Sequence, residues 1–406
     1  MSPLALLVLL VVVATTAGAA VLVPATRGLA RLTGALDAPG PRKVHETPTP
    51  RLGGLAVSLS FSAVALVGLQ LAGPLASHPW TQALLDGHVA LLRDAEKVEG
   101  KLFAVLIGGA FVALVGLVDD LLGARFPAWA KAFGQILAAS ILVGAGIRTE
   151  FLPQPWMNAL VTVLWVVGIT NAFNLLDNMD GLSAGVAFVA SGVLLVNAWA
   201  LGEYFIVLLL AAFMGALLGF LLFNVNPATV FLGDTGSLFI GFVLGALTLL
   251  ERYVSTASSG LFPILMPLLV LAVPILDTTT VTFIRVREGR PIYIGDRCHL
   301  SHRLVDLGLS KRQAVLVIWL ASLGLGLGAV ALPDATPFVT VLILLQSLSM
   351  AAVFLILIFF DRRLVPSAEP TPATVEVPAL AAQNGAGSRL PSVSPVPASG
   401  VLRQGP

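Results

Sequence analysis

The chain has 406 residues, of which 57% are hydrophobic and only 11% are charged, and its formal net charge is +1. Its mean hydropathy of +0.94 exceeds what a soluble core requires, so a water-soluble globular protein is excluded and most of the chain is expected in lipid. Because the basic residues form no soluble basic face, no nucleic-acid partner is expected.

Apolar windows recur along the first 360 residues. A membrane span needs about 20 apolar residues, since about 30 Å of hydrocarbon is covered at 1.5 Å per residue. Eleven windows qualify, of which the eighth is the shortest: 3–23, 53–73, 102–118, 132–147, 157–174, 182–200, 204–223, 237–251, 262–284, 314–332 and 338–360. We therefore predict an all-α membrane protein, a polytopic bundle of about eleven transmembrane helices within an enzyme domain at 1–363. Residues 364–406, rich in Pro, Ala, Ser and Val, are predicted to form a disordered cytoplasmic tail.

Lysine and arginine are distributed unequally between the two sides of the predicted bundle. If the loops alternate from an outside N-terminus, one side carries 18 of the 23 basic residues and the other carries five. The richer side holds loops 24–52, 119–131, 224–236 and 285–313 and the tail. Cytoplasmic loops are enriched in lysine and arginine. We therefore predict an outside N-terminus, an inside C-terminus and a multi-pass protein of the inner (plasma) membrane.

Five polar strings interrupt the apolar sequence, and all of them fall on the predicted cytoplasmic side. They are RKVHETPTPRLGG (42–54), DD (119–120), NAFNLLDNMDG (171–181), FLGDTGS (231–237) and DRCHLSHRL (296–304). Ionisable groups beside lipid cost about 2.5–3.5 kcal/mol each on insertion scales, so they are expected to be functional. The five strings therefore predict a membrane enzyme with one site at the cytoplasmic face.

The first string is basic and contains two prolines that stiffen it. Its Lys43 and His45 are candidates for binding the phosphate of a lipid head group. A simple topology signal is the alternative.

The adjacent carboxylates of Asp119 and Asp120 come at the end of the third window. Two ionised neighbours repel each other in a low-dielectric setting, so a cation or a shared proton is expected nearby. The alternative, a structural helix end, is disfavoured because a carboxylate at a helix C-terminus opposes the helix dipole.

The third and fourth strings offer oxygen ligands. Asn171, Asn174 and Asp177 are spaced by three residues and so share one helix face, and Asp234 stands in a glycine-rich segment. Oxygen ligands favour a hard ion such as Mg²⁺ or Mn²⁺. A polar helix end and an ordinary turn are the respective alternatives.

The segment 285–312 contains seven basic residues together with His299 and His302. Arginine forks match phosphate oxygens, and histidine can donate to them or exchange protons, so a pyrophosphate-bearing substrate would fit. A positive-inside signal or an anionic-lipid patch is the alternative.

Together, and in this order, the five strings resemble the polyprenyl-phosphate N-acetylhexosamine-1-phosphate transferases, glycosyltransferase family 4. The resemblance covers nearly all of 1–363. It implies transfer of a sugar 1-phosphate, in particular GlcNAc-1-phosphate, from a UDP-sugar to undecaprenyl phosphate. UMP is released, and Mg²⁺, with Mn²⁺ as an alternative, is the implied cofactor. The implied role is the first membrane step of cell-envelope polysaccharide synthesis, such as lipopolysaccharide or teichoic acid. A homodimer stays open.

The resemblance also implies roles for individual residues. Asp119, Asp120 and Asp177 are similar to the catalytic aspartates, and Asn174 and Asp234 are similar to the Mg²⁺ ligands. The positions that bind the nucleotide sugar are matched by Asp180, Asn224, Phe231, His299, His302 and Arg303.

Three residues depart from the pattern of this family. The glycosyl-1-phosphate subgroup usually reads DRDHLHHRL where this chain has Cys298 and Ser301, and Asn178 stands in place of a usual glycine. These departures bear on the choice of sugar more than on the reaction.

Two other functions are weighed against this one. A translocase that transfers phospho-MurNAc-pentapeptide belongs to the same family, but its histidine loop has three adjacent histidines. A secondary transporter would place carboxylates near mid-bilayer and on both faces, whereas Asp119, Asp177, Asp180 and Asp234 are all predicted at one face.

Overall fold

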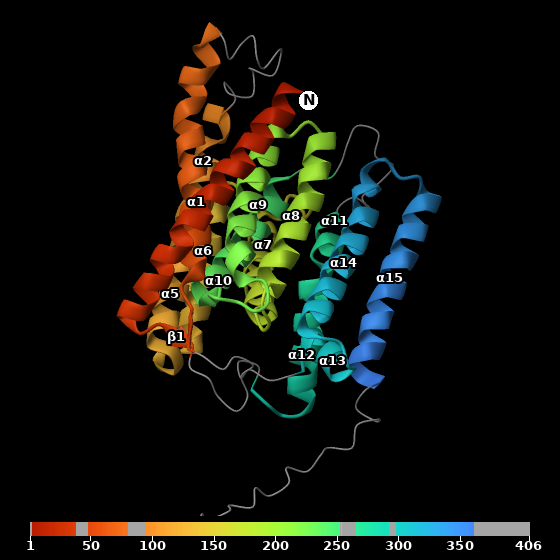
Figure 1. Ribbon diagram of the computed structural model, residues 1–406. Coiled ribbons are helices and arrows are strands. Elements are labelled where there is room, and N and C mark those ends of the chain that lie inside the picture. Colours follow the sequence, from red (N-terminus) through yellow and green to blue (C-terminus); the bar gives the residue numbers. More distant parts are fainter. Residues whose placement is uncertain are drawn as a thin grey trace, which may run out of the picture. The chain divides into compact units, whose positions relative to one another are not determined.

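The computed structural model describes residues 2–37, 48–79, 95–251, 253, 265–291 and 298–360, all within the first of two units, Met1–Arg362. The described part is almost entirely helical (Figure 1). The predicted tail 364–406 and two predicted site residues, Lys43 and His45, lie outside the described residues.

Among the described residues of this unit, eleven helices have 16 residues or more. They are α1 (Pro3–Thr33), α2 (Gly53–Ser77), α5 (Ala95–Leu122), α6 (Ala128–Gly144), α7 (Pro155–Leu176), α8 (Leu182–Ala200), α9 (Tyr204–Asn224), α10 (Gly233–Leu250), α12 (Ala272–Arg287), α14 (Lys311–Val330) and α15 (Pro337–Phe360). The shorter elements are η1 (Gly123–Arg125), α11 (Met266–Val270), α13 (Leu300–Asp306) and η3 (Leu332–Asp334). Strand β1 (Leu36–Asp37) pairs antiparallel with β2 (Thr49–Pro50), with Leu36 opposite Pro50.

Nine helices of the described residues are long and apolar enough to cross a membrane, which confirms an all-α membrane protein. Two predicted windows give shorter helices. The fourth lies on α6, which has 17 residues, and the ninth is divided into α11 and α12. Pro274 explains the division, because it has no amide hydrogen to donate to Val270 and its ring crowds that carbonyl. The count of eleven spans therefore stays a prediction.

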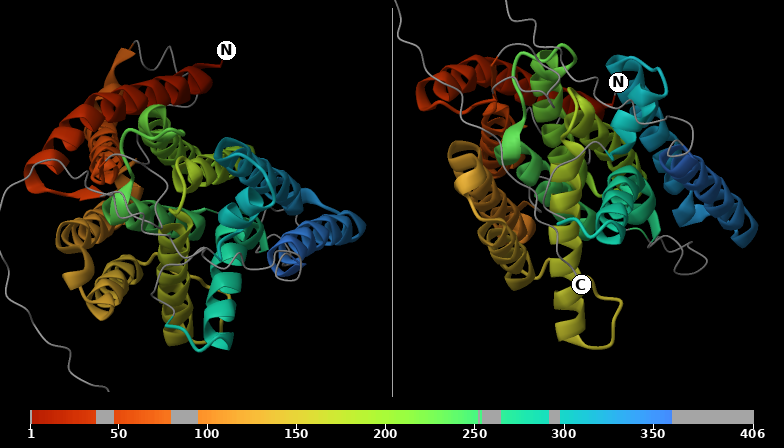
Figure 2. Two further views of the ribbon diagram at one scale, coloured as in Figure 1. Left: turned by 60° about the horizontal axis from the view of Figure 1, so that its bottom comes forward. Right: turned by 90° about the horizontal axis from the view of Figure 1, so that it is seen from below.

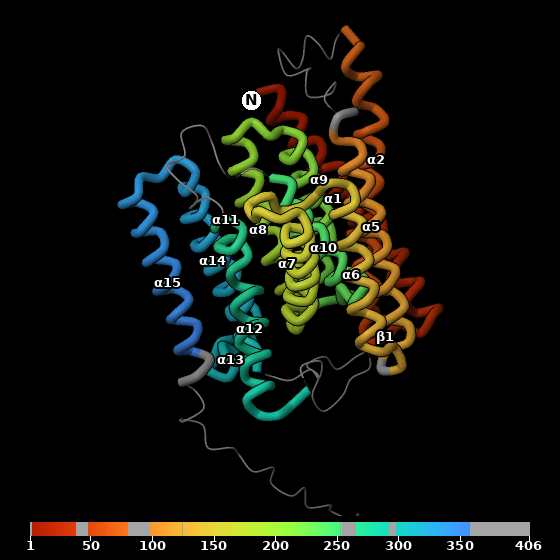
Figure 3. Tube along the Cα trace, turned by 180° about the vertical axis from the view of Figure 1, so that it is seen from behind, coloured from red at the N-terminus to blue at the C-terminus, as the bar shows by residue number. Residues whose placement is uncertain are grey.

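Helix α10 lies at the centre of the bundle. It packs against α5 and α7 and also contacts α2, α8 and α9. It is the most buried of the candidate spans, whereas α1 and α15 are the least buried. Figure 2 shows α1 and α2 on one side of the bundle and α14 and α15 on the other. From behind, α6, α7 and α12 stand in sequence along one face, and α7 contacts both of its neighbours (Figure 3).

Tight packing stabilises this core, because lipid tails are as apolar as leucine and give little hydrophobic driving force between helices. Phe61 of α2 lies edge-to-face against Phe213 of α9 and Phe239 of α10, with ring centroids 5.6 and 5.9 Å apart. Such aromatic pairs contribute about 0.5–1.5 kcal/mol beyond the area that they bury.

Glycines let the first turn of α10 approach its neighbours closely. A Cβ atom on Gly116 of α5 would lie 2.3 Å from the carbonyl oxygen of Asp234, and one on Gly54 of α2 would lie 2.1 Å from the amide nitrogen of Gly236. Both contacts are with backbone, which cannot rotate away. The position of Asp234 therefore depends on residues without side chains on two other helices.

We expect Gly116→Ala to destabilise the protein, by about 1–3 kcal/mol, because the added methyl group overpacks against the backbone of α10. Gly68→Ala in α2 is the matched control, since a Cβ there meets nothing within 4 Å. Alanine also favours a helix over glycine by about 1 kcal/mol, so the control is expected to be neutral or slightly stabilising. Thermal unfolding in detergent measures both variants, and equal unfolding temperatures would contradict this account of the packing.

Candidate active site

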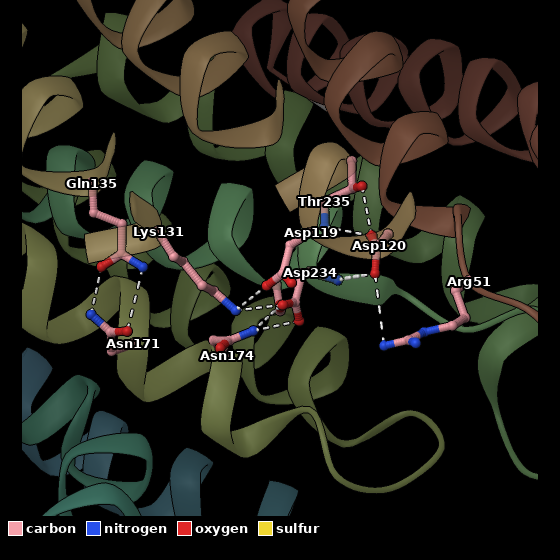
Figure 4. A network of polar contacts seen from close by, with 10 residues as sticks. Arg51, Asp119, Asp120, Lys131, Gln135, Asn171, Asn174, Asp234 and Thr235 are labelled. Carbon is pink, nitrogen blue, oxygen red and sulfur yellow. Dashed lines mark hydrogen bonds and ion pairs between the residues drawn. The ribbon is translucent and has the colours of Figure 1, made fainter. Parts of the chain in front are cut away.

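Carboxylates from two helices and an amide from a third meet in one cluster (Figure 4). Asp119 lies in the last turn of α5, Asp234 in the first turn of α10, and Asn174 in the last turn of α7. The helix ends thus bring together residues that are 60 and 115 positions apart in the sequence.

Lys131 of α6 places a positive charge beside Asp119, one member of the aspartate pair for which a cation or a shared proton was predicted. Its Nζ lies 2.9 Å from Oδ2 of Asp119 and also contacts Oδ2 of Asp234. The two carboxylates therefore face one cationic group. Lys131 was not predicted as a site residue, although it closes the predicted loop 119–131 that begins with the aspartate pair.

Asp120 has different partners from its neighbour. Its Oδ1 accepts the amide hydrogen of Asp234 at 3.0 Å, and its Oδ2 accepts the amide hydrogen of Thr235 at 2.9 Å and the Thr235 hydroxyl at 2.7 Å. The guanidinium of Arg51 lies 3.9 Å from Oδ1. The first amides of a helix have no partners within the helix, so the Asp120 carboxylate caps α10 and stabilises it through the helix dipole. The two adjacent aspartates therefore act on different groups.

Asn171 and Asn174 of the third string also have different partners. Asn174 donates to Oδ1 of Asp234 and to the Ser237 hydroxyl, both at 2.9 Å. Asn171, one turn earlier, instead exchanges amide hydrogen bonds with the buried Gln135 of α6. Asn174 therefore belongs to the carboxylate cluster, whereas Asn171 joins α7 to α6.

Asp177 follows the last residue of α7. Its pKa is raised to about 8, first because the carboxyl group is withdrawn from water and second because the carboxylates of Asp234 and Asp120 are nearby. A carboxyl group with this pKa can hold or release a proton near neutral pH.

The carboxylate oxygens of Asp119 and Asp234 are of the donor type that hard divalent cations prefer. Asp119 and Asp234 converge on a single positive group, and the Asn174 amide is bonded to Asp234. Among the residues that the structure describes, no three His, Cys, Asp or Glu side chains are arranged to hold a metal by themselves. Mg²⁺ commonly takes one or two protein carboxylates and completes its shell with water and substrate phosphates.

The predicted uridine positions lie around the turn between α9 and α10. Asp180 accepts hydrogen bonds from the Asn226 amide at 2.9 Å and from the Ala228 amide nitrogen at 3.1 Å. The Asn224 side chain accepts a hydrogen bond from the Gly181 backbone amide and donates one to the Val230 carbonyl, both at 2.9 Å. Asp180 and Asn224 thus hold this turn against the loop after α7. Phe231 is half-buried, and its amide donates to Pro50 at 2.7 Å. Uridine binding by these residues stays a prediction.

Helix α13 carries His302 and Arg303, and His299 directly precedes it. The imidazole Nδ1 of His299 lies 2.7 Å from Oδ2 of the buried Asp277, whose Oδ1 accepts the Leu300 amide hydrogen at 2.8 Å. The two histidine rings lie 6.5 Å apart. The pairing of Asp277 with His299 was not predicted from the sequence.

Comparisons with known proteins agree with the resemblance in the sequence. The profile described as glycosyl transferase family 4 matches residues 102–251. A probable undecaprenyl-phosphate N-acetylglucosaminyl 1-phosphate transferase of Bacillus subtilis (strain 168) is 34% identical over 350 residues, which cover 84% of this chain and 87% of the relative.

Two further relatives differ in the activities that their names describe. A decaprenyl-phosphate N-acetylglucosaminephosphotransferase of Mycobacterium tuberculosis (strain ATCC 25618 / H37Rv) is 34% identical, over 72% of this chain and 74% of the relative. A phospho-N-acetylmuramoyl-pentapeptide-transferase of Shouchella clausii (strain KSM-K16) is 31% identical, over 68% of this chain and 80% of the relative. These identities extend over most of each protein. The chain therefore belongs to glycosyl transferase family 4, the family of the polyprenyl-phosphate N-acetylhexosamine-1-phosphate transferases.

Proposed function

We propose that the protein transfers GlcNAc-1-phosphate from UDP-GlcNAc to undecaprenyl phosphate and releases UMP, as a first membrane step of cell-envelope polysaccharide synthesis. The observation that carries this proposal is the convergence of Asp119 and Asp234 on one cationic group at the ends of membrane helices. The relatives named for GlcNAc-1-phosphate transfer support the choice of sugar, at 34% identity against 31% for the pentapeptide transferase. Transfer of phospho-MurNAc-pentapeptide is the second candidate.

In the proposed reaction, an oxygen of the lipid phosphate attacks the phosphorus that carries the sugar. A new phosphorus–oxygen bond forms, the bond to UMP breaks, and UMP leaves with the electron pair. The nucleophile is already ionised near neutral pH, so alignment and charge neutralisation matter more than deprotonation.

The residues of the cluster have distinct parts in this reaction. Asp234, Asp119 and Asn174 would hold Mg²⁺. When bound, this ion would neutralise charge on the diphosphate. The Lys131 ammonium, which contacts both carboxylates, can donate to a phosphate oxygen. Asp120 fixes the first turn of α10 and so orients Asp234.

The second half of the site is proposed to bind the donor. His302 and Arg303 of α13, with His299, would donate to the diphosphate, and the turn held by Asp180 and Asn224 would receive the uridine, with Phe231 beside the base. Lys43 and His45 would bind the phosphate of undecaprenyl phosphate.

We further propose eleven spans with the N-terminus outside, the C-terminus inside and the site at the cytoplasmic face of the inner membrane. The distribution of 18 basic residues against five supports this orientation. The described site residues belong to helix ends and connecting segments that this distribution would assign to the cytoplasm.

The direct test of this function uses membranes that contain the protein, undecaprenyl phosphate and a panel of radiolabelled UDP-sugars. We expect a lipid-linked product from UDP-GlcNAc and equimolar UMP. Product from UDP-MurNAc-pentapeptide alone would favour the second candidate, and no product from any donor would contradict the proposal.

We expect Asp234→Asn to lower kcat by about 10²–10³-fold or more, because the substitution removes the negative charge of a proposed metal ligand, a charge that also faces Lys131. Asp334→Asn, in η3, is the matched control outside the cluster and should retain activity. Turnover of Asp234→Asn at the level of the control would remove Asp234 from the active site.

Activity should disappear when EDTA removes divalent cations and return with added Mg²⁺ or Mn²⁺. Asn174→Ala should raise the Mg²⁺ concentration for half-maximal activity by about tenfold, on the scale for losing a supporting ligand. Turnover that persists in EDTA would refute the proposed cofactor.

The proposed topology predicts that a reporter fused after Arg290 is cytoplasmic and that one fused within 86–96 is external. Paired fusions to alkaline phosphatase and to green fluorescent protein read the two sides independently. Both fusion sites on the same side, or the reverse pair of results, would contradict the proposed orientation.

A further inference from the structure

Helix α13 is too short to hold its own orientation. It has seven residues, whereas isolated helices shorter than about 12–15 residues are marginal even in favourable sequences. The directions of His299, His302 and Arg303 must therefore depend on how this helix is attached to its neighbours.

Two polar residues, Asp277 and Asn178, attach the start of α13 to different parts of the bundle. Asp277 of α12 binds the His299 ring and the Leu300 amide. On the next residue, the Ser301 hydroxyl donates to Oδ1 of Asn178 at 2.5 Å. The side-chain amide nitrogen of Asn178 in turn donates to the carbonyl of Leu175, in the last turn of α7, at 3.0 Å. Asn178 thus links α13 to the helix end that carries Asn174 and Asp177.

Ser301 is placed to act on other residues and not on a substrate. Its residue surface is only 1% exposed, and its one hydroxyl hydrogen is donated to Asn178. Burial alone does not force such a pairing, since Ser322 of α14 is also 1% exposed and its hydroxyl finds no partner among the described residues.

We propose that Ser301 and Asn178 are positioning residues. Their hydrogen bond fixes α13, and with it His299, His302 and Arg303, relative to the C-terminal end of α7. This inference rests on the proposed function in one respect, the binding of the donor diphosphate by those three residues. Both partners are uncharged, so the hydrogen bond persists whatever the charge of the neighbouring carboxylates.

Removing the Asn178 side chain should cost more than removing the Ser301 hydroxyl. Asn178→Ala leaves the buried Ser301 hydroxyl without an acceptor, which is costly, whereas Ser301→Ala leaves the half-buried Asn178 amide, which can accept from water. Removing both partners avoids the unpaired hydroxyl. The double variant should therefore be no worse than Asn178→Ala alone, a non-additive result typical of residues in contact.

The kinetic test measures KM separately for the two substrates. We expect Ser301→Ala to raise KM for UDP-GlcNAc by about tenfold, the scale for one lost buried hydrogen bond, and Asn178→Ala to raise it further. Neither variant should change KM for undecaprenyl phosphate. Ser322→Ala is the matched control and should change neither constant. Equal rises in both KM values, or additive effects in the double variant, would overturn the proposal.

A second readout does not require catalysis. Cys298 is the single cysteine of the chain and directly precedes His299, so its rate of alkylation by a maleimide reports how firmly the start of α13 is held. Ser301→Ala should alkylate several-fold faster than the wild type, and Ser322→Ala should not. An unchanged rate in Ser301→Ala would overturn the proposal even if the protein used another donor.

The two readouts separate the two claims. A wild-type protein that transfers nothing from UDP-GlcNAc, together with faster alkylation of Ser301→Ala, would refute the proposed function and retain the positioning role. Ser301→Ala carries the test if Asn178→Ala does not fold, because it removes a single oxygen atom.

Discussion

The arrangement depends on gathering several carboxylates at the ends of membrane helices without leaving their charges uncompensated. Two like charges 4 Å apart repel by about 4 kcal/mol at an effective dielectric constant of 20, so the cluster is stable only with opposite charge close by. The Lys131 ammonium supplies it to Asp119 and Asp234, and the first amides of α10 together with Arg51 supply it to Asp120. Each compensating group comes from a different part of the chain, so the site forms only when α5, α6, α10 and the segment just before α2 are in place.

The packing of the helices and the chemistry of the site are therefore linked through the first turn of α10. That turn carries Asp234, is capped by Asp120 and lies against Gly54 and Gly116 with no room for a side chain. In a membrane, where small residues allow helices to approach closely, such contacts determine helix position. A change of a few tenths of an ångström at either glycine would move a proposed metal ligand.

The sequence predicted the helices and the family well because both depend on local patterns. Apolar windows of span length correspond to described helices, and the fourth and ninth windows differ only where α6 is short and where Pro274 divides the helix. The motifs in chain order were sufficient for the family. Partners distant in the sequence were not predictable in the same way, because a pattern states which groups are polar but not which of them meet. Lys131 beside Asp119, Asn171 with Gln135, and His299 with Asp277 are three such pairs.

We propose that Asp119, Asp234 and Asn174 form a divalent-cation site, and direct binding of Mn²⁺ tests this site without any assumption about the substrates. Electron paramagnetic resonance of free Mn²⁺ during a titration of the purified protein measures how much is bound. We predict one saturable site in the wild type that Mg²⁺ competes for, and Mn²⁺ binding weakened at least about tenfold in Asp234→Asn, which lacks one of the two carboxylate charges. Equal Mn²⁺ binding by the wild type and Asp234→Asn would contradict the claim.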